Sequence, residues 1–266
     1  MLYFVATPIG NLKDLTFRAI ETLNAVDEIA CEDTRHSLTL LNHYGIKKPL
    51  FSYHKFNEKE TGEKIIEKLK AGKNLAVITD AGTPVVSDPG NVLVKLLIEE
   101  GLEYTVVPGA CAFVNALVLS GLPSERFCFL GFLPEKLSAR TELVQAYKSV
   151  DCTLIFYCAP HDVKRDVEFL YSVLGDRRAV AVKEITKMHE KVIPFNLKDG
   201  IDGEQKGEFV VLVEGNTKNP MLEMSEEEHI KYYIAQGIDK KEALKKVAKE
   251  RGVSKSSLYK YIIEKD

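Results

Sequence analysis

The stretch LAVITDAGTPVVSDPG, residues 75–90, decides the fold. It begins as an unbroken apolar run of strand-forming residues, which is typical of a strand buried on both faces of a parallel sheet. It then changes to small and turn-forming residues. Gly82 and Gly90 can adopt backbone angles closed to other residues, while Pro84 and Pro89 fix φ. The apolar residues that follow have helical spacing, so the segment predicts a strand, a long turn and a helix. Ligands bind at the carboxyl ends of strands in open α/β sheets, so this turn is a candidate ligand-binding loop. The alternative is that it only connects the strand to the helix.

Strands and helices alternate on both sides of this segment, which predicts a parallel sheet. The expected strands of the first half are residues 2–6, 27–31, 50–53, 75–78 and 104–107. The second half is less regular, with strands expected at 127–133, 153–158, 179–182 and 208–213 and helices at 137–150 and 163–174. The change near Gly121-Leu122-Pro123 separates two expected α/β domains, 1–121 and 122–218, from a helical tail, 219–266. Polar turns at several strand ends meet at one edge of the sheet, so we expect a pocket there.

Composition indicates a soluble globular protein of the cytoplasm. Of 266 residues, 45% are hydrophobic and 28% are charged, and the longest apolar runs are far shorter than a membrane span. No N-terminal segment resembles a signal peptide. Five scattered cysteines form no C-x-x-C pair, which indicates reduced thiols and no metal site.

The tail differs from the body in charge. Residues 239–265 contain nine basic and four acidic residues, a net charge of +5 in a chain whose total is −3. Ser225 with Glu228 and Asp239 with Glu242 match the capping-box pattern, and Gly237 and Gly252 are expected helix stops. The apolar spacing around Gly252 is that of a helix-turn-helix. Such a unit binds nucleic acid or serves as a plain packing module, and both interpretations stay open here.

Several short motifs follow one another in an order that resembles a known family. They are residues 6–12 (ATPIGNL), 32–35 (EDTR), 52–54 (SYH), 80–84 (DAGTP), 87–90 (SDPG) and 108–109 (PG). Together they resemble the tetrapyrrole-methylase superfamily and, within it, the small-subunit ribosomal RNA cytidine 2′-O-methyltransferases. The resemblance covers about residues 2 to 215.

The resemblance implies a two-domain α/β tetrapyrrole-methylase-like (class III methyltransferase) fold, here with a small all-α helix-turn-helix tail. It implies S-adenosylmethionine held between the two domains and a homodimer. The implied substrate is a cytidine in the decoding centre of small-subunit (16S) ribosomal RNA, within the 30S particle. The implied cofactor-binding residues are Pro8, Asp80, Gly82, Thr83, Val86, Cys111, Ala112 and Tyr157.

Transfer to a ribose hydroxyl needs a proton acceptor, because the hydroxyl is a poor nucleophile. The candidates are Asp33, His54, Glu184 and Lys187. Each candidate also has a structural interpretation. Asp33 can be a helix cap and His54 a histidine that only packs in the core, while Glu184 and Lys187 can form a surface ion pair. Arg35 and Asn57 are the candidate substrate-binding residues, since a guanidinium can bind phosphate oxygens with two donors.

The second domain departs from the family pattern. Cys158-Ala159-Pro160-His161-Asp162 stands where the family usually reads Glu-Ser-Pro-His-Arg. The departures leave the cofactor expectation unchanged but weaken the transfer of RNA-contacting roles. The alternatives are a small-molecule, tetrapyrrole-type methyltransferase and a non-enzymatic helix-turn-helix nucleic-acid binder with a ligand-sensing α/β body. The segment Leu2–Asp14 lacks the G-x-G-x-x-G motif, which argues against a dinucleotide oxidoreductase.

Overall fold

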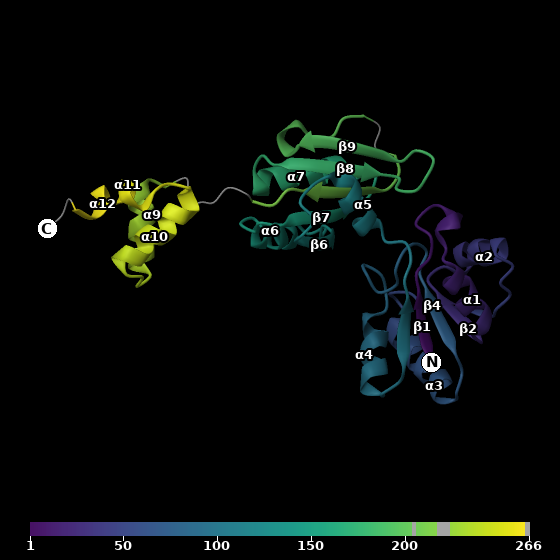
Figure 1. Ribbon diagram of the computed structural model, residues 1–266. Helices are drawn as coiled ribbons and strands as arrows, with labels where there is room; N and C mark the ends of the chain where they lie inside the picture. The colour runs from purple at the N-terminus through teal and green to yellow at the C-terminus, as the bar shows by residue number, and fades with distance from the viewer. Residues whose placement is uncertain (204–205, 217–223, 264–266) are drawn as a thin grey trace. The chain divides into compact units, whose positions relative to one another are not determined.

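The computed structural model describes residues 1–203, 206–216 and 224–263. It is a mixed α/β structure with two five-stranded sheets and a helical C-terminal unit (Figure 1). Residues 1–148 and 152–215 form one compact unit, and the chain from residue 216 forms a second with residues 149–151. Within the described ranges, no helix has both the length and the apolar character needed to cross a bilayer.

The first sheet is entirely parallel and has the order β3-β2-β4-β1-β5. Its strands are β1 (Leu2–Val5), β2 (Glu28–Cys31), β3 (Leu50–Ser52), β4 (Leu75–Ile78) and β5 (Tyr104–Val107). Successive residues of β4 enter different cores: Val77 packs with one layer, and Ala76 and Ile78 pack with the other. This explains why β4 is apolar throughout, as predicted for a strand covered on both faces.

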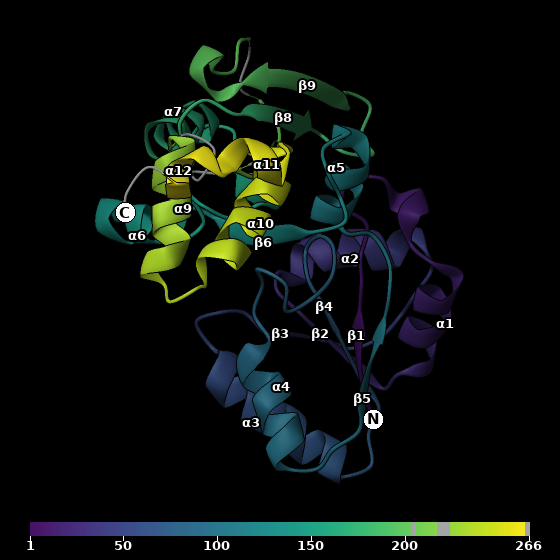
Figure 2. The ribbon, with the colours of Figure 1, turned by 60° about the vertical axis from the view of Figure 1, so that its left-hand side comes forward.

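Helices cover both faces of this sheet. They are α1 (Phe17–Ala25), α2 (Thr34–His43), α3 (Glu58–Lys70) and α4 (Asn91–Glu99), with a 3₁₀ turn, η1 (Leu12–Asp14), before α1. Figure 2 shows α3 and α4 together on one side and α1 on the other. Thr16 caps α1 by accepting from the backbone N–H of Ala19 at 3.1 Å, while Asn11 caps η1. Helix α3 ends at a glycine: Gly72, with φ of 84°, directly follows its C-terminal cap.

The second sheet is mixed and has the order β6-β7-β10-β8-β9. Its strands are β6 (Phe127–Phe132), β7 (Thr153–Cys158), β8 (Arg178–Lys183), β9 (Lys191–Asn196) and β10 (Phe209–Val213). Only β6 and β7 pair in parallel; the other three pairings are antiparallel. Strand β9 was not predicted, because it is largely exposed and contains Pro194. An edge strand tolerates both features.

Helices α5 (Ala112–Ser120), α6 (Leu137–Ala146) and α7 (Val163–Leu174) and the 3₁₀ turn η2 (Leu197–Asp199) accompany the second sheet. Ala116 and Leu117 of α5 pack in one buried cluster with Ile155, Val180 and Leu212. Helix α5 therefore belongs to the layer of the second sheet, although it precedes the domain boundary expected at residue 121. That boundary stays a prediction.

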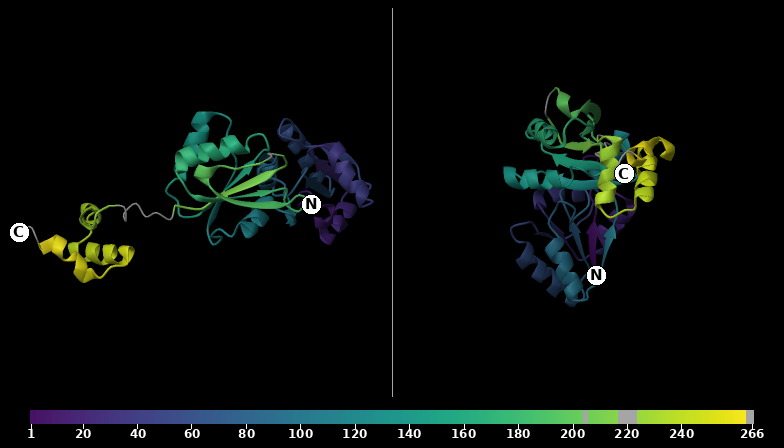
Figure 3. Two further views of the ribbon diagram at one scale, coloured as in Figure 1. Left: turned by 90° about the horizontal axis from the view of Figure 1, so that it is seen from above. Right: turned by 90° about the vertical axis from the view of Figure 1, so that its left-hand side faces the viewer.

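The C-terminal unit has its own core (Figure 3). Its helices are α9 (Glu226–Ala235), α10 (Lys240–Arg251), α11 (Lys255–Leu258) and α12 (Lys260–Ile263). The capping box at Ser225 is confirmed, and Gly237 and Gly252 take positive φ just past α9 and α10. Asp239 caps α10 by accepting from the backbone N–H of Lys241 at 3.0 Å. The second helix of the expected helix-turn-helix, which follows Gly252, is divided at Tyr259 into α11 and α12.

Candidate active site

A cavity of about 400 Å³ lies in the first compact unit, at the carboxyl end of β4. This size is within the range of small-molecule sites. Both sheets contribute to its wall: the turn after β4, the start of α5, the ends of β6 and β7, and strands β8 and β10. The lining residues are Ile9, Glu32, Asp80, Ala81, Gly82, Thr83, Val86, Ser87, Asp88, Cys111, Ala112, Phe132, Tyr157, Cys158, Ala159, Pro160, Val182, Ile185, Glu208, Phe209 and Val210.

The turn after β4 is held in an unusual backbone conformation. Gly82 has φ of 83° and exchanges two backbone hydrogen bonds with Thr7, at 2.9 and 3.1 Å. Val85 and Ser87 also have positive φ, 77° and 65°, which costs non-glycine residues free energy and is common at functional sites. The Thr83 hydroxyl donates to the carbonyl oxygen of Ala110 at 3.3 Å. This bond ties the turn to the segment that leads into α5.

Most residues that the resemblance implied for cofactor binding meet at this cavity. Asp80, Gly82, Thr83, Val86, Cys111, Ala112 and Tyr157 all line it. Pro8 does not; it is buried, and its neighbour Ile9 lines the wall instead. Whether these residues bind a cofactor stays a prediction.

The cavity wall is strongly acidic. Four carboxylate residues line it, Glu32, Asp80, Asp88 and Glu208, and its described lining contains no Lys, Arg or His. Burial, followed by repulsion from Glu32 and Asp80, raises the pKa of Asp88 to about 6. Burial and then repulsion from Asp80 raise the pKa of Glu32, against an attraction from His54. Glu208 is exposed and paired with Lys187, but the partly buried carboxylates Glu32, Asp80 and Asp88 repel one another, which favours a ligand that carries positive charge.

An aromatic group forms the side of the wall that belongs to the second sheet. The Tyr157 ring lies edge-on to Phe132 and Phe129, with centroid distances of 5.5 and 4.8 Å. Phe129 in turn stacks on Phe113 at 4.4 Å. Burial raises the pKa of Tyr157 to about 12, so its hydroxyl stays neutral at physiological pH. The ring faces offer a cation a second favourable partner.

The candidate proton acceptors of the first sheet lie outside the cavity lining. The Asp33 carboxylate caps α2 by accepting from the backbone N–H of Arg35 at 2.8 Å. The pKa of Asp33 is lowered by this bond and by the Arg35 guanidinium, whose 91% exposed side chain lies 3.3 Å away. The buried Nδ1 of His54 has no hydrogen-bond partner among the residues that the structure describes. The Asn57 side chain accepts from the backbone N–H of His54 at 2.8 Å and donates to the carbonyl of Ser52 at 3.1 Å, which closes the turn after β3.

Glu184 and Lys187 form the ion pair that was considered from the sequence, with Nζ 2.9 Å from Oε1. Lys187 lies at the same distance from Glu208, which lines the cavity, although the pair itself does not. Glu184 and Thr186 both have positive φ, at 51° and 66°. The Thr186 hydroxyl hydrogen-bonds the Asp14 carboxylate at 2.6 Å. This loop of the second sheet is thereby fastened to the first.

A match to a family model decides the family. The model described as Tetrapyrrole (Corrin/Porphyrin) Methylases matches residues 1–200. The chain belongs to the tetrapyrrole methylase family. Two curated relatives, both named ribosomal RNA small subunit methyltransferase I, come from Halalkalibacterium halodurans and Haemophilus influenzae. The first is 43% identical, over 97% of this chain and 93% of the relative. The second is 44% identical, over 98% of this chain and 95% of the relative.

Solved structures agree with this tetrapyrrole methylase fold. A crystal structure of diphthine synthase superimposes with a TM-score of 0.66 at 19% identity, covering 82% of this chain and 91% of that one. The recognition of the family and of its two-sheet fold with a helical tail is therefore confirmed.

Sequence reasoning missed several cavity residues of this tetrapyrrole methylase. Glu32 precedes Asp33 in the same motif, and Asp88 belongs to the quoted SDPG segment, so both had a local signal. Phe132 ends β6, whereas Glu208 directly precedes β10. Neither was identified, because these two segments are far apart in the sequence and come to the same cavity only in the folded protein.

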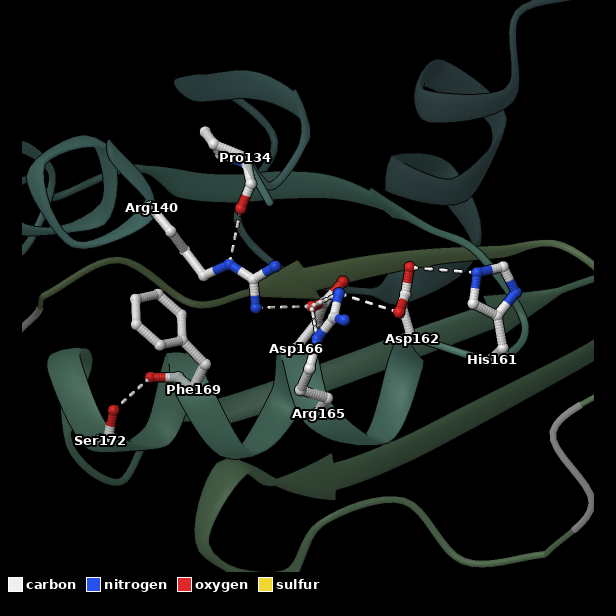
Figure 4. Close-up of polar contacts among 8 residues, drawn as sticks. All are labelled: Pro134, Arg140, His161, Asp162, Arg165, Asp166, Phe169 and Ser172. Carbon is white, nitrogen blue, oxygen red and sulfur yellow. Dashed lines mark hydrogen bonds and ion pairs between the residues drawn. The ribbon is translucent and has the colours of Figure 1, made fainter. Parts of the chain in front are cut away.

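A buried ion pair supports the wall formed by the second sheet (Figure 4). Arg140 lies 3.2 Å from Asp166, and both side chains are about 95% buried. The Arg140 Nε also donates to the carbonyl of Pro134 at 2.8 Å, two residues after Phe132. Arg165 pairs with Asp162, which stands where the family usually has arginine, at 2.8 Å. The cluster therefore joins the segments that follow β6 and β7, both of which contribute to the cavity.

Proposed function

We propose that this protein is an S-adenosylmethionine-dependent methyltransferase that methylates the 2′-oxygen of a cytidine in the decoding centre of small-subunit ribosomal RNA. The observation that carries the proposal is the acidic cavity at the strand ends of a tetrapyrrole methylase fold. The names of relatives more than 40% identical over nearly the whole chain support ribosomal RNA as the substrate. The 2′-oxygen and the cytidine rest on the motif resemblance.

The donor set of the cavity fits S-adenosylmethionine. Its carboxylates, among them Asp80 and Asp88, and the rings of Phe132 and Tyr157 suit a ligand that carries a sulfonium and an ammonium group. Ala81, Gly82 and Ala112 have small side chains, so polar ligand groups can approach the backbone at these residues closely. When bound, S-adenosylmethionine supplies a methyl group already activated on positively charged sulfur. The protein then has to align the acceptor oxygen, which can be worth about 7–11 kcal/mol.

The proton of the ribose hydroxyl needs an acceptor. Asp33, His54, Glu184 and Lys187 stay proposals for this role, although none of them lines the cavity. We add Glu32, which does line it and whose raised pKa makes the carboxylate a better base.

We propose that the phosphates of the RNA and a second subunit contact surfaces outside the cavity. The Arg35 side chain is almost fully exposed, and we retain it as a phosphate-binding residue. We also retain Asn57 as a substrate-binding residue, and its side chain closes the turn after β3. A homodimer in the cytoplasm stays part of the proposal. Exposed apolar residues support it: Val106 on edge strand β5 is 48% exposed, and Val118 of α5 is 77% exposed.

The proposal is tested by mapping ribose methylation on ribosomal RNA from cells that lack the protein, with and without a plasmid copy. Loss and restoration of one cytidine methylation in the small-subunit RNA is expected. In vitro, the protein should transfer label from S-adenosylmethionine to small subunits isolated from the deletion strain. Labelling of a porphyrinoid in place of RNA would favour the small-molecule alternative. Cofactor binding without turnover on either acceptor would favour the ligand-sensing binder.

A further inference from the structure

Charge in the C-terminal unit is divided between its helices. The first turn of α9 carries three consecutive glutamates, residues 226–228. Residues 239–263, which include α10 to α12, contain eight basic and three acidic residues. A folded unit that is acidic on one helix and basic on the others has a definite electropositive side.

Three lysines of α10 carry positive charge that no carboxylate in the described part of the chain compensates. Lys241, Lys245 and Lys249 are exposed, and no salt bridge joins them to a carboxylate in the described part of the chain. By contrast, Lys231 lies 2.5 Å from Glu227, and Lys260 lies 3.7 Å from Glu226. The three lysines of α10, which we name the lysine face, are therefore available to an external anion.

Packing within the C-terminal unit keeps the lysine face exposed to solvent. Ala243, Leu244, Val247 and Ala248 are buried in the core of the C-terminal unit, so α10 turns one side inward. The three lysines recur every four residues on the solvent side, with a rise of about 6 Å between successive lysines. A nucleic-acid strand presents one phosphate per about 3.4 Å of axis, so each lysine can reach a separate phosphate.

We propose that the lysine face binds the sugar-phosphate backbone of RNA and adds a second, sequence-independent contact for the substrate. This inference rests on the proposed function, which makes small-subunit RNA the polyanion present during the reaction. The helix pair after Gly252 is poorly suited to reading DNA bases, because α11 and α12 are four residues each and are separated at Tyr259. Recognition of a DNA major groove relies on a continuous helix or a β-ribbon.

The test compares full-length variants of equal net charge. Lys245→Gln/Lys249→Gln removes two charges from the lysine face, while the control Lys231→Glu changes net charge by the same amount on α9. Binding is measured by anisotropy with a labelled small-subunit RNA hairpin and with a DNA hairpin of the same sequence, over a series of salt concentrations. Loss of two phosphate contacts lowers the slope of log affinity against log salt by about 1.4–1.8 and weakens binding about 10- to 30-fold at 0.15 M salt.

The expected result is this loss in the double variant, wild-type behaviour in Lys231→Glu, and unchanged S-adenosylmethionine affinity and melting temperature in both. Equal effects of the two variants, or no effect of the double variant, would overturn the lysine face as a binding site. Tighter wild-type binding to the DNA hairpin than to the RNA hairpin would overturn RNA as its ligand. Failure of the proposed function is a separate outcome, seen as absent cofactor binding or absent RNA methylation in the wild-type protein.

Discussion

Replacing Asp88 with asparagine is expected to stabilise the protein at neutral pH. The pKa of Asp88 is raised from 3.8 to about 6, first by burial and then by Glu32 and Asp80. A folded-state pKa above the unfolded value means that ionisation opposes folding. This destabilisation is absent at low pH, where Asp88 is protonated in both the folded and the unfolded state. It reaches its full size above the pKa of the folded state. At 1.36 kcal/mol per unit, the shift corresponds to an upper limit of about 3 kcal/mol at pH 8 and about 1 kcal/mol at pH 4.5.

Urea unfolding of Asp88→Asn and the wild type at these two pH values measures the effect. The variant should gain free energy of unfolding at pH 8 and show a clearly smaller gain at pH 4.5. Asp202→Asn removes an exposed carboxylate and serves as the control, with no change expected at either pH. A variant no more stable than the wild type at pH 8, or a gain that grows as the pH falls, would refute the reasoning about buried charge.

The same substitution should weaken the binding of a cationic ligand. By calorimetry, S-adenosylmethionine affinity is expected to fall about tenfold or more, since a lost charge interaction of about 1.4 kcal/mol corresponds to a factor of ten. Its demethylated product has a neutral sulfur and should lose less affinity. Equal losses for the two ligands would show that Asp88 does not act through the sulfonium charge.

Further variants test the proton acceptor, the buried ion pair and the cavity. Glu32→Gln should lower the turnover rate at saturating S-adenosylmethionine about 100-fold or more, as expected for loss of a general base; Asp33→Ala, measured beside it, should chiefly weaken the α2 cap, by about 1 kcal/mol in unfolding experiments. Arg140→Met should destabilise the protein by up to about 3–5 kcal/mol, because it removes the buried partner of Asp166 and leaves only the more exposed Arg165; Arg140→Met/Asp166→Leu should recover most of that loss. Ala112→Phe should fill the cavity and abolish S-adenosylmethionine binding in calorimetry with a melting temperature near that of the wild type; retained binding would place the cofactor elsewhere.

Local patterns in the sequence predicted the first sheet well. The apolar run of β4 and the bounds of β5 followed from burial and periodicity, which are properties of neighbouring residues. Strand β9 was missed because an exposed edge strand with Pro194 has no such pattern. The mixed pairing of the second sheet was not predicted either, since it depends on contacts between distant strands.

The same difference between local patterns and long-range contacts applies to the candidate site. The turn from Asp80 to Asp88 could be identified because its glycines, prolines and small residues are consecutive. The choice of Asp33 over Glu32 was a different problem, because the two adjacent carboxylates have the same chemistry and only the packing shows which one lines the cavity. Whether either acts in catalysis stays a prediction.

The position of β10 in the second sheet has a consequence for synthesis on the ribosome. This strand is the last of the sheet to be translated, yet it lies at the centre, between β7 and β8. Until it emerges, a nascent chain has neither the middle of that sheet nor Phe209 and Val210 of the cavity wall. Ligand capture should therefore begin abruptly, only in chains long enough to expose this strand, and would report completion of both sheets.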